Sequence, residues 1–301
     1  MRKLFYIFAI VFFTGMTLVG CQKSKDAATS ADANADSEEQ TAISADEPTG
    51  KGGDAPIAQF EKKKVKVTKR DNQKNIDVKI EVDYPLAGPE KAVQAIREYI
   101  MEQLEKPMII MPGEKKQKPH FTGDLNDKDA LIDFYAQAWL DYLSEDWDNN
   151  CPGMEAEIEI ERLDDNDHFI TYETKVYQFQ GGAHPNREQS GMTFRASDGK
   201  KITNFFDKIP ENIIKKLIAE DVDAEAKQSV LNGGLPNTPP YLADGSLKYV
   251  YQEGEIASNS LGTIEAEIDL GDIIKYFSDE AKALFDDWKF IANDDDDDEI
   301  G

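Results

Sequence analysis

The sequence predicts an α+β fold in which antiparallel sheets, built from hairpins, pack against several helices. Apolar and charged residues alternate through residues 76–82, which is the two-residue period of a strand with one buried face. Apolar residues recur at helical spacing in residues 92–104 and 131–142. Short turns join the strands and helices separate them irregularly, which favours antiparallel pairing over a regular parallel α/β arrangement.

The chain opens with a secretory segment. Two cations, Arg2 and Lys3, precede an apolar run over residues 4–13 that is too short for a stable membrane span and typical of a signal peptide. The following Leu-Val-Gly-Cys, ending at Cys21, resembles the lipobox of bacterial lipoproteins. The resemblance implies that residues 1–20 are removed and that Cys21 carries fatty acyl chains such as palmitate, which anchor the protein in a bilayer. The alternative is an ordinary secreted protein with a chance cysteine.

Residues 21–59 are expected to form the lipidated cysteine and a disordered tether. No aromatic residue occurs from 22 to 59, and small, polar and acidic residues dominate. Such a segment buries too little apolar surface to offset the entropy of ordering the chain. We therefore expect a flexible connection that holds a folded body away from the membrane.

The folded body begins near Phe60 with a hairpin. A strand around residues 65–67, a turn at 71–74 and the alternating run at 76–82 make up this element. Tyr84-Pro85 is expected to end the second strand, because proline cannot donate to a ladder. A helix opened by Pro89 follows; its apolar stripe consists of Ala92, Val93, Ile96, Tyr99, Ile100 and Leu104.

A Lys- and Pro-rich loop over residues 106–120 leads to a second helix at about 128–144, whose apolar face is rich in aromatic residues. A second hairpin is predicted over residues 154–179, turning at 164–167. A strand at 192–196 and a tight turn at 197–200 come next.

Helices and strands alternate in the remainder of the chain. We predict a helix at 211–227, a Gly- and Pro-rich loop at 233–240, strands at 247–251 and 264–270, and helical turns at 272–277 and 279–288. Ser278 is the predicted N-cap of the last helix. Residues 293–301 are expected to be a disordered acidic tail.

Charge and cysteine content limit the possible partners. The chain has 34 Lys and Arg against 59 Asp and Glu, a net charge of −25. This argues against nucleic acid and against electrostatic docking on anionic lipid, and it would attract a cationic partner. A generic solvated surface is the simpler interpretation of this charge.

Cys21 and Cys151 are the two cysteines of the chain. The acidic residues before Cys151 disfavour a thiolate there, so we interpret Cys151 as a turn residue or small hydrophobe.

Three stretches resemble a known extracellular domain: YQFQGGAHPN at residues 177–186, FRASDGKKI from Phe194 with a later Phe-Phe pair, and the run from Leu247 to Gly262. In this order they resemble the RsiV-type extracellular domain, a domain of unknown function named after a lysozyme-sensing anti-sigma factor. The region from Val65 to Phe179 is similar to the module that precedes the catalytic domain in PdaC-type peptidoglycan deacetylases. We divide the body accordingly into residues 60–180, PdaC N-terminal-like, and residues 181–292, RsiV-type, packed together.

The resemblance implies an exported domain that recognises a cell-wall enzyme such as lysozyme. Two loops would contact the partner, and their candidate residues are Gly182, His184, Pro185, Glu255 and Ile256. Gly254 and Ser258 stand where the family usually shows an aromatic residue and a proline, a departure in the second loop. The anti-sigma factor's cytoplasmic segment and membrane span have no counterpart here, so sigma-factor regulation is not carried over.

No motif in the sequence predicts a catalytic or metal site. His120, His168 and His184 share no short spacing suited to zinc, and neither Gly-x-Ser-x-Gly nor His-Glu-x-x-His occurs. The Gly-Gly pair and the His-Pro step around His184 favour a structural role, with backbone freedom followed by a rigid exit from a strand. Residues 164–167 are rich in oxygen ligands but lack the pattern of a calcium loop, so we interpret them as a turn.

We therefore predict a non-catalytic, lipid-anchored envelope lipoprotein that binds a protein or cell-wall ligand, including lysozyme-like muramidases, with no cofactor, metal or nucleic acid. The alternatives are a structural or accessory lipoprotein of peptidoglycan remodelling and a carboxylate-based hydrolase. Gln22 follows the lipidated cysteine, where an acidic residue would resemble an inner-membrane retention signal. This favours the outer membrane and leaves the leaflet open.

Overall fold

The computed structural model of the chain describes residues 59–71, 74–108, 118–145, 153–286 and 289. The predictions for the signal peptide, for Cys21 and the tether, for Cys151 and for the tail at 293–301 lie outside these residues. Within the described part, no helix combines the length and the apolar composition needed to span a bilayer.

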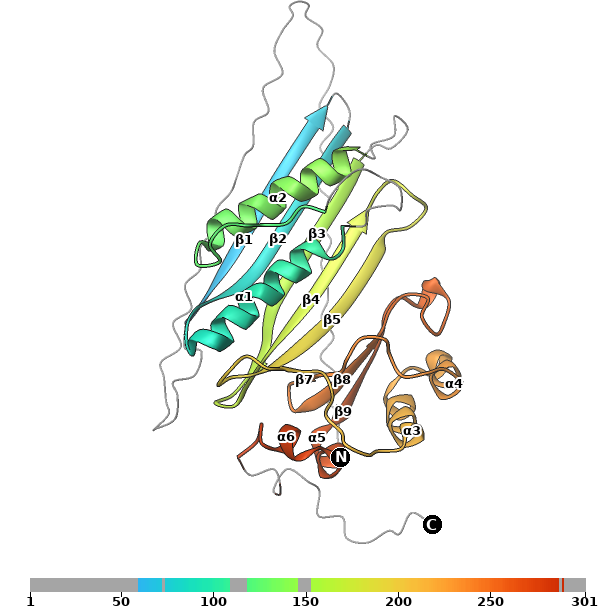
Figure 1. The fold of residues 1–301 in the computed structure, drawn as a ribbon. Coiled ribbons are helices and arrows are strands. Elements are labelled where there is room, and N and C mark those ends of the chain that lie inside the picture. Colours follow the sequence, from blue (N-terminus) through green and yellow to red (C-terminus); the bar gives the residue numbers. More distant parts are fainter. Residues whose placement is uncertain (1–58, 72–73, 109–117, 146–152, 287–288, 290–301) are drawn as a thin grey trace, which may run out of the picture. The chain divides into compact units, whose positions relative to one another are not determined.

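A six-stranded sheet in the order β1-β2-β3-β4-β5-β6 forms the first part of the fold (Figure 1). Its strands are β1 (Gln59–Asp71), β2 (Lys74–Ala87), β3 (Gly153–Asp165), β4 (Phe169–Phe179), β5 (Asn186–Arg195) and β6 (Lys201–Ile202). Together with the helices it confirms the predicted α+β class.

One strand pair of this sheet is parallel. β2 and β3 run side by side in the same direction, whereas every other neighbouring pair is antiparallel. The chain between them forms α1 (Glu90–Glu105) and α2 (Lys128–Glu145), which lie across one face of the sheet (Figure 1). A parallel pair needs such a crossover, because the chain must return to the end from which it started.

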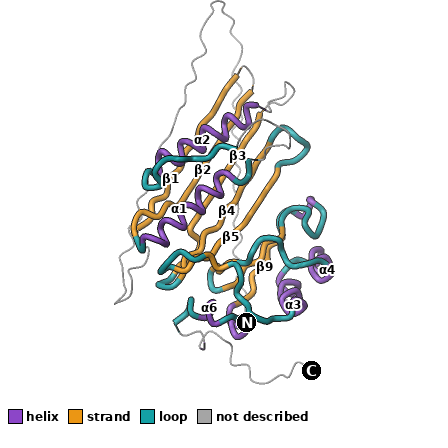
Figure 2. Tube along the Cα trace, in the orientation of Figure 1, coloured by secondary structure: helices purple, strands orange, loops and turns teal. Residues whose placement is uncertain are grey.

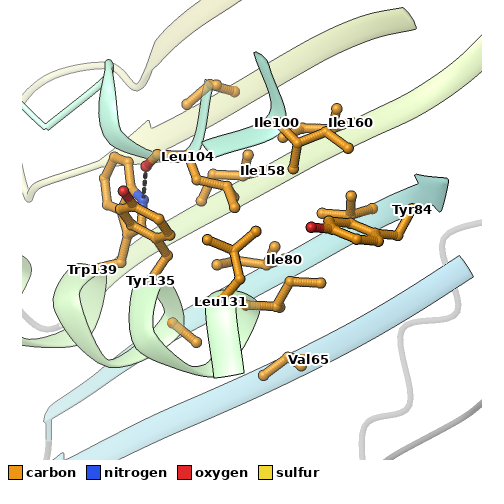
Figure 3. Packing of buried hydrophobic residues seen from close by; sticks show 14 of the residues in the cluster. Val65, Ile80, Tyr84, Ile100, Leu104, Leu131, Tyr135, Trp139, Ile158 and Ile160 are labelled. Atoms are coloured by element: carbon orange, nitrogen blue, oxygen red, sulfur yellow. Dashed lines mark hydrogen bonds between the residues drawn. The ribbon is translucent and has the colours of Figure 1, made fainter. Parts of the chain in front are cut away.

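The helix-covered face of the sheet holds the first hydrophobic core (Figure 3). Alternate residues of β2 and β3, among them Ile80 and Ile158, are fully buried against the apolar faces of both helices. Trp139 of α2 donates its indole N–H to the Leu104 carbonyl of α1 at 3.0 Å, so the largest buried side chain leaves no polar atom unsatisfied. Burial of an aliphatic side chain such as Ile80 or Ile158 contributes about 1.5–3 kcal/mol to the stability of the fold.

The expectation that Tyr84-Pro85 ends the second strand is wrong. β2 continues to Ala87, and Pro85 pairs with Phe60. Pairing of β2 with β3 stops at Val82, so Pro85 lies where β2 has a partner on one side, the place where a strand tolerates proline. Buried Arg97 of α1 donates two hydrogen bonds to the Pro85 carbonyl, at 2.9 and 3.1 Å, and holds this end against the helix.

A three-stranded antiparallel sheet in the order β7-β8-β9 follows, with β7 (Tyr241–Ala243), β8 (Ser246–Tyr251) and β9 (Ile264–Asp269). The helix predicted at 211–227 is two helices, α3 (Glu211–Asp221) and α4 (Ala224–Asn232). The break occurs because Val222 adopts an extended conformation, and the neighbouring Asp221 carboxylate accepts the Glu267 amide of β9 at 2.8 Å.

Short helical turns complete this part: α5 (Leu270–Ile273), a 3₁₀ turn (Ile274–Tyr276) and α6 (Asp279–Lys282), with a further 3₁₀ turn at Asn259–Leu261. The Ser278 hydroxyl accepts the Ala281 amide at 3.2 Å, which confirms Ser278 as the N-cap of α6. A second hydrophobic core lies among these helices and the three strands, with Phe205, Tyr251 and Ile273 fully buried in it.

The division suggested after residue 180 lies in the loop between β4 and β5. These two strands pair over ten residues, from Phe169–Arg195 to Gln178–Asn186. Residues 186–202 therefore continue the first sheet, and the separate second sheet begins at Tyr241.

Candidate binding surface

The six-stranded sheet has a second face, opposite α1 and α2, which we call the open face. Side chains alternate between faces along a strand, so the residues between the buried apolar positions of β2 to β5 point here. Strand register arranges them in rows across β1 to β5. One row is Lys66, Lys79, Glu157, Tyr177 and Arg187, and the next is Lys64, Glu81, Glu159, Lys175 and Gln189. Beyond the end of the β2–β3 pairing, Lys62 is in register with Asp83, and Glu161 with Glu173 and Gly191.

Ion pairs join neighbouring strands on the open face. Lys62 lies 2.8 Å from Glu161, 3.2 Å from Glu81 and 3.6 Å from Asp83, bridging β1 to β2 and β3. Burial lowers the pKa of Lys62, but the hydrogen bonds and charges of these carboxylates outweigh burial and raise it. Burial raises the pKa of Asp83. This effect is larger than the opposite effect of Lys62 and of the Arg162 amide, which lower the pKa.

A buried charged network joins the open face to the three-stranded sheet. Glu173 of β4 is 6% exposed, and its Oε1 accepts the Tyr241 hydroxyl at 2.7 Å and the Gln189 side-chain amide at 3.0 Å. Lys248 of β8 lies 3.3 Å from the same oxygen, and Lys175 lies 2.7 Å from the other. Burial raises the pKa of Glu173, but these hydrogen bonds and cations outweigh it and lower the pKa.

Gly191 lets the two sheets approach at this network. A Cβ atom at Gly191 would lie 2.3 Å from Cγ of the Tyr241 ring. The Leu242 amide also donates to the Thr193 hydroxyl at 2.9 Å. β7 therefore packs directly on β5, with no room for a side chain at residue 191.

A segment after β8 covers part of the free edge of β5. The Gln252 side chain accepts the Gln189 amide at 3.0 Å and donates to the Gln189 carbonyl at 2.6 Å, as a neighbouring strand would. Arg187 Nη1 lies 3.4 Å from Glu253 Oε1. This contact fixes the base of the 252–258 loop on the same strand that follows the Gly-Gly-Ala-His-Pro loop.

A cleft of about 170 Å³ opens on the open face beside this contact. Glu157, Glu159, Lys175, Tyr177 and Arg187 line it. Thr263, at the start of β9, closes one side. None of these residues stands out as a candidate site residue from the sequence. Charged positions alternate with apolar ones along residues 155–161, and this pattern indicates the solvent face of a strand. The pattern does not indicate the register that brings three strands together at the cleft.

The first predicted loop, which contains Gly182, His184 and Pro185, extends beyond the ends of β4 and β5 (Figure 2). Gly182 and His184 are exposed, and His184 Nδ1 lies 3.2 Å from the Pro185 carbonyl oxygen. The loop therefore offers an accessible imidazole at one end of the sheet.

The second predicted loop is shaped by Glu255. Its carboxylate accepts the Asn237 amide at 2.7 Å and the Gln252 amide at 2.8 Å. Ile256 packs against the second core, near Gly233, and both Glu255 and Ile256 line a cavity of about 430 Å³ beside α4. Gly254 has a φ of 76°, and a Cβ there would lie 2.3 Å from Asn259 Oδ1, so the local backbone favours glycine at this position.

The structure joins the two predicted loops through β5. Arg187 contacts Glu253 and Gln189 contacts Gln252, next to both loops. Within the described residues, no group of three or more His, Cys, Asp or Glu side chains has the arrangement of a metal site.

Comparisons with known proteins establish the fold. No protein-family model matches the sequence, and no curated protein matches it. Among solved structures, a DUF3298 family member from Bacteroides fragilis NCTC 9343, BF2082, is similar with a TM-score of 0.58 and 14% identity over 77% of this chain and 98% of that one. A DUF3298 family protein from Pseudomonas aeruginosa PAO1, PA4972, has a TM-score of 0.48 and 13% identity over 75% and 95%. The chain thus shares the fold of the first protein, whose family is a domain of unknown function.

Proposed function

We propose that this chain is a lipid-anchored, non-catalytic binding protein of the bacterial envelope, held in the outer membrane through Cys21, and that its partner is a cationic protein of the lysozyme-like muramidase class. The lipobox-like residues before Cys21 support the anchor. The resemblance of the later stretches to the RsiV-type domain, and of the earlier region to the PdaC module, supports a cell-wall setting.

One observation carries the proposed mode of binding: acidic side chains, of which Glu155 is exposed, and the Gly-Gly-Ala-His-Pro loop share one end of the sheet. Glu155, exposed at the start of β3, is in register with Phe179, where β4 ends and the loop begins. Asp77 of β2 is the neighbour of Glu155 on its other side. A cationic surface docking here would meet the exposed Glu155 and His184, with the partly buried Asp77 beside them, a charge match that favours association.

The contacts of the two loops support binding better than chemistry. The Glu255 carboxylate already accepts two backbone amides, so its role is to hold the loop's shape. His184 is exposed and lies beside a backbone carbonyl rather than beside a side chain that it could activate. Both residues suit a preformed contact surface.

The test is binding of hen-type lysozyme to the full chain in detergent across a salt series. We expect micromolar or tighter binding that persists at about 0.15 M salt, where exposed charges more than about 8 Å apart are largely screened. Glu155→Lys and His184→Ala should each weaken binding at least tenfold. Glu220→Lys makes the same charge reversal on the exposed face of α3 and is the matched control.

Two outcomes would contradict the proposal. Binding that disappears at moderate salt, or that Glu155→Lys and Glu220→Lys weaken equally, would indicate non-specific charge attraction. Absence of binding in the folded full chain would remove the muramidase, and cell-wall glycan would become the ligand to test, in line with the accessory role in peptidoglycan remodelling.

A further inference from the structure

The cleft on the open face has opposite charges on its two sides. Glu157 and Glu159 of β3 line one side; Lys175 of β4 and Arg187 of β5 line the other, where Glu188 of β5 is the one acidic neighbour in the lining. Register places Glu157, Tyr177 and Arg187 in one row across these strands. With neighbouring strands about 4.8 Å apart, the outer two α-carbons of that row are roughly 10 Å apart.

The cationic side is preorganised. The Arg187 guanidinium carbon lies 5.3 Å from the centroid of the Tyr177 ring, and Glu253 holds one of its nitrogens at 3.4 Å. Its side chain is still 53% exposed, so donors remain accessible. Lys175 is tied to Glu173 at 2.7 Å and is 51% exposed. Two restrained, accessible cations suit a carboxylate, which guanidinium can bind in a bidentate manner.

The anionic side is also accessible. Glu157 and Glu159 have side chains about one-third exposed, and both face Lys79, which contacts Glu157 and lies 3.7 Å from Glu159. One lysine shared between two carboxylates leaves acceptor capacity for a second cation, since an ionised carboxylate has about four lone-pair sites.

We propose that this cleft binds a small zwitterion of dipeptide size, with its carboxylate on Arg187 and Lys175 and its ammonium on Glu157 and Glu159. A volume of about 170 Å³ lies below the roughly 300–1,000 Å³ typical of drug-sized ligands. An extended dipeptide spans roughly 7 Å at about 3.3–3.6 Å per residue, which fits between side chains reaching inward from β3 and β5. The carboxylates disfavour polyanions, and the cations disfavour metal ions and polyamines.

This inference is independent of the proposed muramidase partner. It rests on the cleft residues, whereas the protein-binding test uses Glu155 and His184 at the end of the sheet. Either site can fail its test while the other passes.

The experiment titrates the full chain in detergent with glycylglycine and follows binding by calorimetry and by amide NMR shifts of Tyr177 and Arg187. N-acetylglycylglycine lacks the ammonium and glycylglycinamide lacks the carboxylate; each should bind at least tenfold more weakly. Arg187→Gln should remove the preference for glycylglycine over glycylglycinamide but keep the preference for a free amine. The double variant Glu157→Gln and Glu159→Gln should lose the preference for a free amine but keep the preference for glycylglycine over glycylglycinamide. Lys216→Gln, on exposed α3, should change neither.

A thermal melt of each variant confirms that it is folded, and Arg187→Lys, which keeps the charge, should retain part of the carboxylate preference. Glycine binding as tightly as glycylglycine would assign the same chemistry to a free amino acid. The proposal is overturned if folded protein does not bind glycylglycine at tens of millimolar, or if the three dipeptide derivatives bind equally.

Discussion

At the residue scale, Gly191 sets how closely β7 and β5 approach. The ring of Tyr241 occupies the position where any side chain at 191 would lie, and the Tyr241 hydroxyl is then within 2.7 Å of Glu173. Backbone freedom is not the reason for glycine here, because the residue belongs to a regular strand. Glycine is needed for close approach of another element.

Gly191→Ala should lower the free energy of unfolding by about 1–3 kcal/mol, because the added methyl group collides with a buried ring in a close-packed contact. Gly234→Ala is the matched control, since nothing lies within 4 Å of a Cβ at that position. Urea unfolding followed by far-UV circular dichroism compares the two. Equal stability of both variants would show that β7 does not rest on Gly191.

If Cys21 is acylated as proposed, Cys21→Ser should abolish incorporation of labelled palmitate and release the protein from the membrane fraction, because the proposed anchor consists of acyl chains on that sulfur and on the new amino terminus. Cys151→Ser, the other cysteine, should leave labelling unchanged. Labelling that persists in Cys21→Ser would contradict the lipobox interpretation. Gradient separation of inner and outer membranes from the wild type tests the outer-membrane assignment.

At the element scale, β5 shows which features of the fold a single sequence could predict. Alternation of apolar and charged residues identified β2 and β3, because periodicity is a local property. The middle of β5, Gln-Ser-Gly, has no apolar alternation, so only its end at residues 192–196 was predicted. Its edge is completed by Gln252, 63 residues later, through a contact that no local pattern encodes.

The same limit applies to the candidate site. The charged face of residues 155–161 could be predicted, but Lys62 meets Glu161 across 99 residues and through a parallel strand pair. The parallel pair depends on a crossover by two helices that the sequence showed as separate elements. Glu255 was selected as a binding residue, whereas its hydrogen bonds to two backbone amides depend on the position of Asn237.

Gln252→Ala should speed hydrogen exchange of the Gln189 amide at least tenfold and reduce stability by about 1–3 kcal/mol, because a partly buried donor and acceptor lose their partners. Gln228→Ala, exposed on α4, should affect neither quantity. NMR-detected exchange measures both variants. An unchanged Gln189 amide in Gln252→Ala would mean that water or another group satisfies the β5 edge.

At the scale of the whole molecule, a buried polar network links the two sheets, beside an apolar contact of Tyr241, Ala243 and Val250 with Leu163 of β3. Glu173 and Lys248 are 6% and 8% exposed and belong to different sheets. Lys248 also lies 2.5 Å from Glu265 and 3.7 Å from Glu267 of β9, so it has three acidic neighbours. Removing one charged side chain leaves its partners buried without enough opposite charge. We therefore expect the network to couple the unfolding of the two cores.

Glu173→Gln should destabilise the protein by about 1–3 kcal/mol at pH 7, because Lys248 loses its most buried counter-ion and keeps only the more exposed Glu265 and Glu267. Lys248→Met should have a similar effect, and the double variant should be less destabilised than the sum, since neither charge is then left unpaired. Two separate thermal transitions in the single variants would show the cores uncoupling. Simple additivity of the two changes would mean that the pair does not act as a unit.

The pH dependence of stability provides an independent test of this network. The folded-state pKa of Glu173 lies below its unfolded value of about 4.3, so its contribution is present above that pH and is lost as pH falls through the lower folded value. Burial lowers the pKa of Lys248, but Glu265 and Glu173 outweigh it and raise the pKa, so the lysine contributes below about 10.4 and loses its effect as pH rises through the higher folded value. The wild type should therefore lose stability at both extremes.

Glu173→Gln should lose less stability than the wild type between pH 7 and pH 3 in urea unfolding, which flattens the acid limb of the stability curve. Glu220→Gln, exposed on α3, should leave this limb unchanged. An acid limb that is identical in Glu173→Gln and wild type would assign the acid sensitivity to other carboxylates, such as Glu81 of the open face.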